Sequence, residues 1–219
     1  MLTLIATPIG RIDEITLRSL DLLKNADVVI CESTKETSKL LKGHGIKALR
    51  YEVLNEHSTK DDVADLTRLC REQNAVLVSD CGTPSFCDPG FQLVEACRAE
   101  NIKVQSSLGA SSLMGLISLS SERIYQFHFR GFLPAENVAR EREWQLLKKN
   151  RECIVLMDTP YRLKKMIDEC SVHLADRKLL LVLNLSQEDE TVLEGLPAKI
   201  KQQLTFEKAE FMILVYAKN

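Results

Sequence analysis

The sequence predicts an α/β protein with two domains, the first built on a mainly parallel sheet and the second on a mixed sheet. Two observations support this fold class. Short apolar runs of strand length alternate regularly with helix-period patterns up to about residue 117. Beyond that point the alternation is less regular. We therefore expect domains at residues 1–117 and 118–219, a division that a chain of 219 residues allows.

In the first domain each apolar run is followed by an amphipathic helix pattern. The expected strands are 2–6, 27–31, 48–53, 75–78 and 102–105. Helices are expected around Leu17–Leu23, Thr37–Leu41, Thr59–Arg71, Leu93–Cys97 and Leu113–Ile117. For the fourth of these helices, Asp88 and Pro89 have the residue types of an N-cap and a first helical position. Strand–helix alternation of this kind predicts a parallel sheet covered by helices.

The second domain is expected to contain five strands, at 126–129, 153–157, 178–183, 188–193 and 211–216. Helices are expected at Glu136–Lys149, after Asp158–Leu163 and after Pro197. Basic residues between 140 and 165, including Arg140 and Arg142, alternate with glutamates. Such a mixture is typical of a solvated helix face rather than of an RNA groove.

Composition excludes several classes of protein. Hydrophobic residues make up 45% of the chain and the net charge is −2, so there is no overall basic signature of nonspecific nucleic-acid binding. Seven cysteines cannot all pair internally, and most lie in apolar runs, as reduced core cysteines of a cytosolic protein do. No His or Cys pairs have the spacing of metal ligands, and no apolar run approaches the ~20 residues of a membrane span.

The stretch from Ala75 to Gly90 carries the strongest signal of a site. A buried strand leads into a loop of Asp, Cys, Gly, Thr and Pro, and a helix follows. In parallel sheets this order forms a ligand crevice at the carboxyl edge. The alternative is an ordinary strand-to-helix connection. Polar loops with Gly or Pro follow most of the other strands at the same edge, which favours a site.

Several of these loops occur together, in order and spacing, in one known family. The shared motifs are Ala6–Gly10, Asp13–Thr16, Glu32–Thr34, Glu56–His57, Ser79–Gly90, Gly131–Pro134 and Thr159–Leu163. On these motifs, from Leu2 to about Val215, the chain resembles the ribosomal RNA small-subunit methyltransferase I family. Members are 2′-O-ribose cytidine methyltransferases of the tetrapyrrole (class III) methylase superfamily.

The resemblance implies a cytoplasmic homodimer, free of membranes, that binds S-adenosylmethionine between its two domains. It also implies that ribosomal RNA or the small ribosomal subunit is the partner. Matched position by position, the implied cofactor-binding residues are Pro8, Cys81, Gly82, Thr83, Ser111, Ser112 and Met157. Small residues and free backbone groups suit such a ligand, because they let adenosine and methionine approach closely.

Catalysis at a ribose 2′-hydroxyl requires removal of its proton as the new bond forms. Glu32 and His57 are our candidates for this acceptor-side chemistry, with Asp80 shaping the loop. Asp80 has the alternative of bonding only loop amides, and His57 that of an ordinary surface residue. Arg162 either binds a phosphate or pairs with a carboxylate across the domain interface. His44, His128 and His173 are expected to be structural.

The chain departs from the family mainly on the acceptor side. Leu108–Ser111 replaces Pro-Gly-Pro-Ser, and Asn184–Gln187 replaces Glu-Leu-Thr-Lys. Ser33 and Lys35 stand where the family has an acidic residue and Arg. Two alternatives therefore stay open: a methyltransferase acting on a small molecule such as a tetrapyrrole, and a cofactor-binding protein that has lost catalysis.

Overall fold

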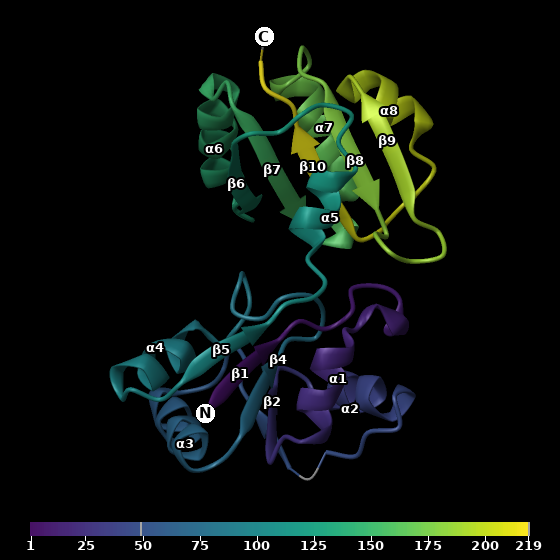
Figure 1. Cartoon of the computed structure of the whole chain (residues 1–219). Coiled ribbons are helices and arrows are strands. Elements are labelled where there is room, and N and C mark those ends of the chain that lie inside the picture. Colours follow the sequence, from purple (N-terminus) through teal and green to yellow (C-terminus); the bar gives the residue numbers. More distant parts are fainter. Residues whose placement is uncertain (49, 219) are drawn as a thin grey trace. The chain divides into compact units, whose positions relative to one another are not determined.

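The computed structural model describes residues 1–48 and 50–218, which form two compact units (Figure 1). Met1–Ser112 and Leu113–Asn219 each enclose their own five-stranded sheet. The division falls at residue 112, whereas the sequence analysis places it after 117. The helix at this point, α5 (Ser112–Ser118), buries Leu116 in the core of the second unit.

The first sheet is entirely parallel, as predicted, with the strand order β3-β2-β4-β1-β5. Leu2 of the central strand pairs with Ala75 on one side and with Val104 on the other. The strands are β1 (Leu2–Ile5), β2 (Val28–Cys31), β3 (Tyr51–Val53), β4 (Ala75–Val78) and β5 (Val104–Ser107). β2 and β4 are buried along their whole length, which explains their continuous apolar sequences.

Helices cover both faces of this sheet (Figure 1). The 3-10 turn η1 (Ile12–Glu14), α1 (Leu17–Lys24) and α2 (Thr34–Gly43) follow β1 and β2, and residues of α1 and α2 join one core. α3 (Lys60–Glu72) and α4 (Phe91–Ala99) pack on the opposite core. Local sequence sets three helix starts: Thr16 and Ser33 are N-caps, and Thr59 forms a capping box with Asp62.

Three expectations for the first unit need correction. The third strand is shorter than 48–53, and Leu49 lies outside the described residues. β5 begins and ends two residues later than expected, so Ser107 belongs to the strand. Helix α4 begins at Phe91 with Gly90 (φ 135°) as its N-cap, so Asp88 and Pro89 precede it. The cap position is taken by Gly90, two residues after Asp88.

The second sheet is mixed, as predicted, with the order β6-β7-β10-β8-β9. β6 and β7 are parallel, and the other neighbours are antiparallel. The strands are β6 (Phe127–Phe132), β7 (Cys153–Asp158), β8 (Leu179–Leu183), β9 (Thr191–Gly195) and β10 (Phe211–Val215). β6 continues through residues expected to be its exit, because a bulge between Phe129 and Gly131 (φ 65°) keeps it paired with β7.

The helices of the second unit pack mainly on one face of its sheet. α6 (Asn137–Lys149), the 3-10 turn η2 (Pro160–Arg162), α7 (Leu163–His173) and α8 (Pro197–Gln203) lie in the second half of the chain. Trp144, Met166 and Ile200 bring α6, α7 and α8 into one core, whereas α5 packs on the opposite face. β9 begins at Thr191 rather than near 188, because residues 184–187 form a turn with positive φ at Asn184 and Ser186.

Two cysteines differ from the expectation of a reduced core. Five cysteines are buried, but Cys81 and Cys87 are exposed in the loop after β4. None of the seven forms a disulfide in the part of the chain that the structure describes. Across residues 1–48 and 50–218, no helix is both long enough and apolar enough to cross a membrane.

Candidate functional site

Two loops expected to hold a cofactor are bonded to each other at the carboxyl edge of the first sheet. Thr7 and Gly82 exchange backbone hydrogen bonds of 2.9 and 3.1 Å. The buried Thr7 hydroxyl also donates to the carbonyl oxygen of Ser79, at 3.1 Å. This junction lies between β1 and β4, neighbouring strands from which the chain leaves to opposite faces of the sheet. Ligand crevices of α/β sheets form where the connections diverge in this way.

The loop after β5 joins the same group. The Thr83 hydroxyl donates to the carbonyl oxygen of Ala110 at 3.0 Å. A Cβ added to Gly109 would lie 3.0 Å from the Cβ of Ala6, so a residue larger than glycine would crowd the end of β1. The structure thus brings the segments of Pro8, Cys81–Thr83 and Ser111–Ser112 to one edge of the first unit.

Small residues at this edge would let a bulky ligand come close to the backbone. Gly82 has φ +76°, a conformation that glycine adopts without strain. A Cβ built there makes only an ordinary van der Waals contact, with Ile9 Cγ1 at 3.8 Å, although Gly82 itself is buried. Cys81 and Thr83 are exposed on either side of it. Small residues such as these let a bulky ligand approach the backbone closely.

Two acidic candidates, Glu32 and Asp80, connect the loops after β2 and β4 through bonds to each other's loop, a pair called the Glu32–Asp80 clasp below. A carboxylate oxygen of Asp80 accepts the backbone N–H of Ser33 at 3.2 Å. In return, the backbone N–H of Asp80 hydrogen-bonds the carboxyl group of Glu32. Asp80 therefore bonds an amide of the neighbouring loop, which agrees with the alternative given for it as well as with a loop-shaping role. The Glu32 carboxyl group thus lies beside the Asp80 backbone.

Partial burial raises the pKa values of the carboxyl groups in this cluster. Desolvation, followed by the charges of Asp80 and Asp88, raises the pKa of Glu32. Desolvation likewise raises the pKa of Asp80 and that of Asp88. A carboxylate with a raised pKa is a better proton acceptor than an ordinary one.

His57 is placed differently. Its side chain is 83% exposed, and its Nε2 lies 3.5 Å from a carboxylate oxygen of its neighbour Glu56. Its backbone N–H donates to the Asn55 side chain at 2.9 Å. Backbone hydrogen bonds order the loop, and within the described residues the imidazole ring contacts its neighbour Glu56. The described contacts do not attach His57 to the Glu32–Asp80 clasp.

In the second unit, the half-buried Met157 precedes an ion-pair network at the end of β7. Arg140, only 2% exposed, places Nη1 3.0 Å from Asp158 and Nε 2.9 Å from both carboxylate oxygens of Glu169. Its Nη1 also donates to the carbonyl oxygen of Pro134, at 3.2 Å. Arg140 thus links the loops after β6 and β7, and the expectation that it lies on a solvated face is wrong.

Sequence reasoning missed Arg140, although a signal existed. Arg140, Trp144 and Leu147 are spaced four and three residues apart, so they share the buried face of α6. A lone arginine on such a face needs carboxylate partners, and Asp158 and Glu169 supply them.

Arg162 pairs with a carboxylate, but not across a domain interface. Its Nη1 lies 3.3 Å from Asp158, four residues earlier in the same unit. The preceding residue, Tyr161, is 80% exposed, and the Lys208 ammonium lies 5.3 Å from the centre of its ring.

The other three histidines belong to segments other than these loops. His44 contacts the carbonyl oxygen of Ile12 at 2.9 Å, and His173 stacks on Trp144 with ring centres 5.2 Å apart. His128 lies in β6. Within residues 1–48 and 50–218, no three His, Cys, Asp or Glu side chains are grouped to hold a metal ion.

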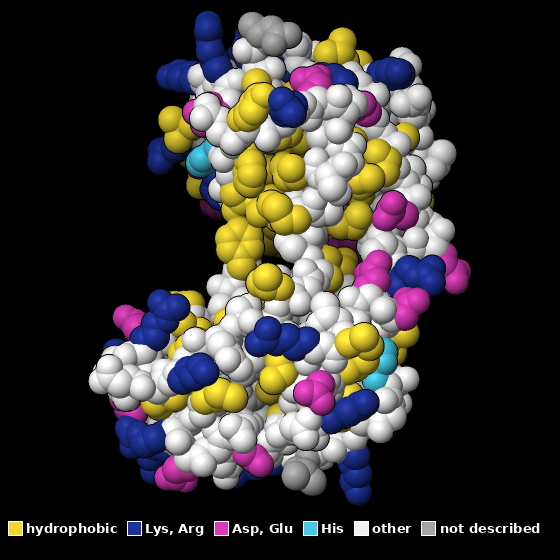
Figure 2. Space-filling view, in the orientation of Figure 1, with side chains coloured by type: hydrophobic (Ala, Val, Ile, Leu, Met, Phe, Trp, Pro, Cys, Tyr) yellow, Lys and Arg dark blue, Asp and Glu magenta, His cyan; other side chains and the backbone are white. Residues whose placement is uncertain are grey.

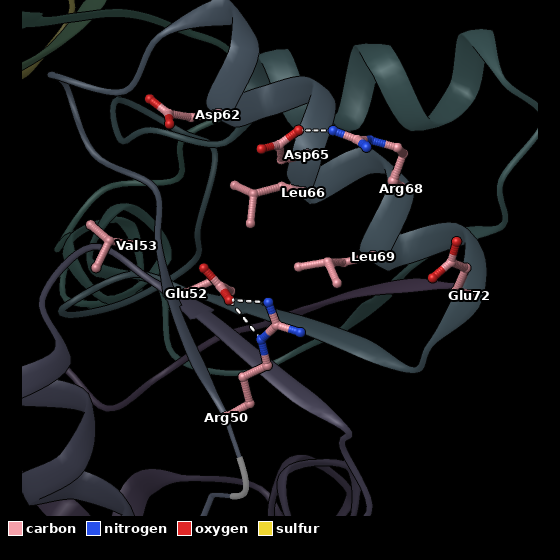
Figure 3. A pocket seen from close by; sticks show the side chains of 9 residues that line it. All are labelled: Arg50, Glu52, Val53, Asp62, Asp65, Leu66, Arg68, Leu69 and Glu72. Carbon is pink, nitrogen blue, oxygen red and sulfur yellow. Dashed lines mark hydrogen bonds and ion pairs between the residues drawn. The ribbon is translucent and has the colours of Figure 1, made fainter.

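A separate groove of ≈ 380 Å³ lies beside β3 and α3 (Figure 3). Its rim is charged, but both arginines are already paired, Arg50 with Glu52 and Arg68 with Asp65. Its nine lining residues include none from the loops described above. On the face shown in Figure 2, Lys and Arg side chains are scattered among acidic and hydrophobic ones.

Comparison with known proteins identifies the family. The model of the tetrapyrrole (corrin/porphyrin) methylases matches residues 1–201. The chain belongs to this family. Curated relatives named ribosomal RNA small subunit methyltransferase I are about 30% identical over nearly the whole chain. The one from Borrelia garinii is 33% identical over 221 residues, which are 98% of each chain. The resemblance to that branch of the tetrapyrrole methylases is confirmed.

Solved structures of tetrapyrrole methylases and a related enzyme share the fold. A diphthine synthase superposes with a TM-score of 0.72 at 16% identity, covering 100% of this chain and 90% of its own. The uroporphyrin-III C-methyltransferase of Thermus thermophilus, solved with S-adenosyl homocysteine, superposes with a TM-score of 0.65 at 14% identity. That comparison covers 98% of this chain and 96% of the other. The predicted two-domain class III methyltransferase fold and the methyltransferase class are therefore confirmed.

Proposed function

We propose that this tetrapyrrole methylase transfers a methyl group from S-adenosylmethionine to a ribose 2′-hydroxyl of small-subunit ribosomal RNA. The observation that carries the proposal is the junction of three loops at the carboxyl edge of the first sheet, beside the carboxyl of Glu32. The names of the relatives support RNA as the acceptor. With the family resemblance, the proposal includes a homodimer acting in the cytoplasm, away from membranes.

The cofactor residues that we propose are Pro8, Cys81, Gly82, Thr83, Ser111 and Ser112 of the first unit and Met157 of the second. S-adenosylmethionine would supply an activated methyl group on its sulfonium. The chain contributes position: the bonds of Thr7 to Gly82 and of Thr83 to Ala110 hold the loops rigid before binding. Methyl transfer is an in-line displacement, so prior positioning of donor and acceptor supplies much of the rate enhancement.

Glu32 is the group that we propose accepts the 2′-hydroxyl proton. Its raised pKa strengthens it as a base, and the Asp80 backbone N–H hydrogen-bonds it. Asp80 acts by fixing the loop at Ser33. His57, in the loop after β3, is the second candidate, because its imidazole is exposed to an incoming substrate.

The pH dependence tests the role of Glu32. Replacing Asp88 with Asn removes a negative charge that raises the pKa of Glu32. The acid limb of kcat/KM should therefore move to lower pH, because Glu32 then loses its proton more readily. Profiles of methyl transfer between about pH 4 and 8 measure the shift. The control is Asp61→Asn, on the exposed first turn of α3; an equal shift in the control, or none in Asp88→Asn, contradicts the role.

The same groups affect stability. Raised folded-state pKa values mean that the ionised carboxylates of Glu32, Asp80 and Asp88 oppose folding. Their unfavourable contribution is absent below the unfolded-state pKa values and grows as pH rises through the folded-state ones. Asp88→Asn should thus raise the free energy of unfolding at pH 7 relative to wild type, and the gain should disappear near pH 3. Urea titrations at both pH values measure it.

The acceptor is tested by supplying tritiated S-adenosylmethionine with purified small ribosomal subunits, followed by nucleoside analysis of the RNA. We expect label in a 2′-O-methylnucleoside. Calorimetric titration with S-adenosylmethionine and S-adenosylhomocysteine accompanies it. Binding without label in RNA would contradict the RNA acceptor and leave a small-molecule acceptor or a non-catalytic binding protein. Absence of binding would overturn the methyltransferase proposal itself.

A further inference from the structure

We propose that Tyr161, Arg162 and Lys208 of the second unit form a docking site for one nucleotide of single-stranded RNA. The base would stack on the Tyr161 ring, and Arg162 and Lys208 would contact its phosphates. This inference rests on the proposed function and adds the surface that grips the acceptor strand. It starts from an exposed aromatic ring that the fold does not need.

Tyr161 has the geometry of a stacking platform. It lies in η2, between β7 and α7, and is 80% exposed. The rigid end of β7 and the start of α7 hold its backbone on both sides. The Lys208 ammonium lies over the ring at 5.3 Å. Proteins bind single strands by pairing such exposed rings with nearby cations, because every base has a face that can stack.

The positive charge of the neighbouring Arg162 is only partly balanced by its carboxylate partner. Arg162 places Nη1 3.3 Å from Asp158, but Asp158 is already paired with Arg140 at 3.0 Å. One carboxylate therefore serves two guanidinium groups. A guanidinium carries five N–H donors, so Arg162, with a side chain that is 34% exposed, retains donors for a phosphate.

The surrounding network has an excess of positive charge. Its cations are Arg140, Arg162, Lys164, Lys165 and Lys208, and its carboxylates are Asp158, Glu169 and Glu207. Two positive charges thus remain unmatched within it. The carboxyl edge of the first sheet, with Glu32, Asp80 and Asp88, is acidic and repels phosphate. Phosphate contacts are accordingly favoured at the second unit.

The chain offers a matched control at the opposite edge of the same sheet. Tyr125 is 83% exposed and also has a cation over its ring, Arg123 at 5.5 Å. It precedes β6, whereas Tyr161 follows β7, which runs parallel to β6. Arg123 donates to the Tyr125 hydroxyl at 3.1 Å. The two tyrosines are alike in exposure and chemistry but different in place.

The experiment compares Tyr161→Ala, Tyr161→Phe and Tyr125→Ala. Fluorescence anisotropy measures binding of a labelled single-stranded ribosomal RNA oligonucleotide, and tritium transfer measures KM and kcat for small subunits. We expect Tyr161→Ala to weaken oligonucleotide binding and raise KM about tenfold. Its kcat should change less than twofold and its affinity for S-adenosylmethionine should not change. Tyr161→Phe, which keeps the ring, should bind like wild type, as should Tyr125→Ala.

A charge test is independent of the ring. Lys208→Gln should make the plot of log binding constant against log salt shallower by about 0.7, the contribution of one phosphate contact on a single strand. The docking site would be overturned if Tyr161→Ala bound the oligonucleotide as tightly as wild type does. It would also be overturned if Tyr125→Ala lost as much affinity as Tyr161→Ala. If the wild-type protein transfers no methyl group to small subunits, the proposed function fails, while the anisotropy measurements still decide the docking site.

Discussion

Replacing Arg140 with methionine is expected to lower the free energy of unfolding by about 3–5 kcal/mol, the usual cost of breaking a buried ion pair from one side. The substitution keeps the apolar stem but leaves Asp158 and Glu169 without their shared cation. The Asp158 side chain is only 1% exposed, so water cannot replace the guanidinium there. The loss includes the hydrogen bond to the Pro134 carbonyl, which ties down the loop after β6. Urea-induced unfolding followed by circular dichroism measures the change.

Arg142→Met is the matched control. Arg142 is on the same helix, two residues away, but exposed, so its replacement should change the free energy of unfolding by less than about 0.5 kcal/mol. Arg140→Lys keeps a charge but not the planar fork that reaches three partners, and it should lie between the two. Equal stabilities of Arg140→Met and Arg142→Met would show that the network contributes nothing to the fold.

The order of strands and helices could be predicted because local sequence specifies it. The runs at 28–31 and 75–78 are buried on both faces, so they are continuously apolar. Thr16, Ser33 and Thr59 cap helices by bonds to backbone three residues ahead, an interaction within reach of any local pattern. Parallel strands end at one edge of the sheet, so the sequence also predicted that the loops after them lie together.

The misplaced elements depended on contacts between distant residues. Asp88 has the residue type of an N-cap, but Gly90, with a φ of 135°, takes the cap position. Arg140 was assigned to solvent because its partners, Asp158 and Glu169, lie 18 and 29 residues further on. Arg162 found its carboxylate within its own unit rather than in the other. Such pairings are decided by tertiary packing, which periodicity does not encode.

Replacing Gly82 with tryptophan is expected to abolish binding of S-adenosylmethionine, lowering affinity by at least a hundredfold. Gly82 is buried and a Cβ there would already contact Ile9, so an indole would take up the space a ligand needs beside it. The left-handed φ of +76° also disfavours any side chain, by roughly 1–2 kcal/mol. Loss of binding could therefore come from a filled site or from a strained loop, and the two causes need to be separated.

Substitution of Gly45 provides a control that separates a filled site from a strained loop. It has a φ of +65°, and a Cβ added there meets nothing within 4 Å, so Gly45→Trp carries similar backbone strain after α2. Gly45→Trp should keep the calorimetric signal with S-adenosylmethionine, and Gly82→Trp should lose it. Because Gly82 is buried and Gly45 is exposed, Gly82→Trp should also lose more free energy of unfolding. Gly82→Ala, strained but small, should retain binding within about tenfold of wild type. Undiminished binding by Gly82→Trp would remove the loop after β4 from the cofactor site and, with it, the assignment of Cys81 and Thr83.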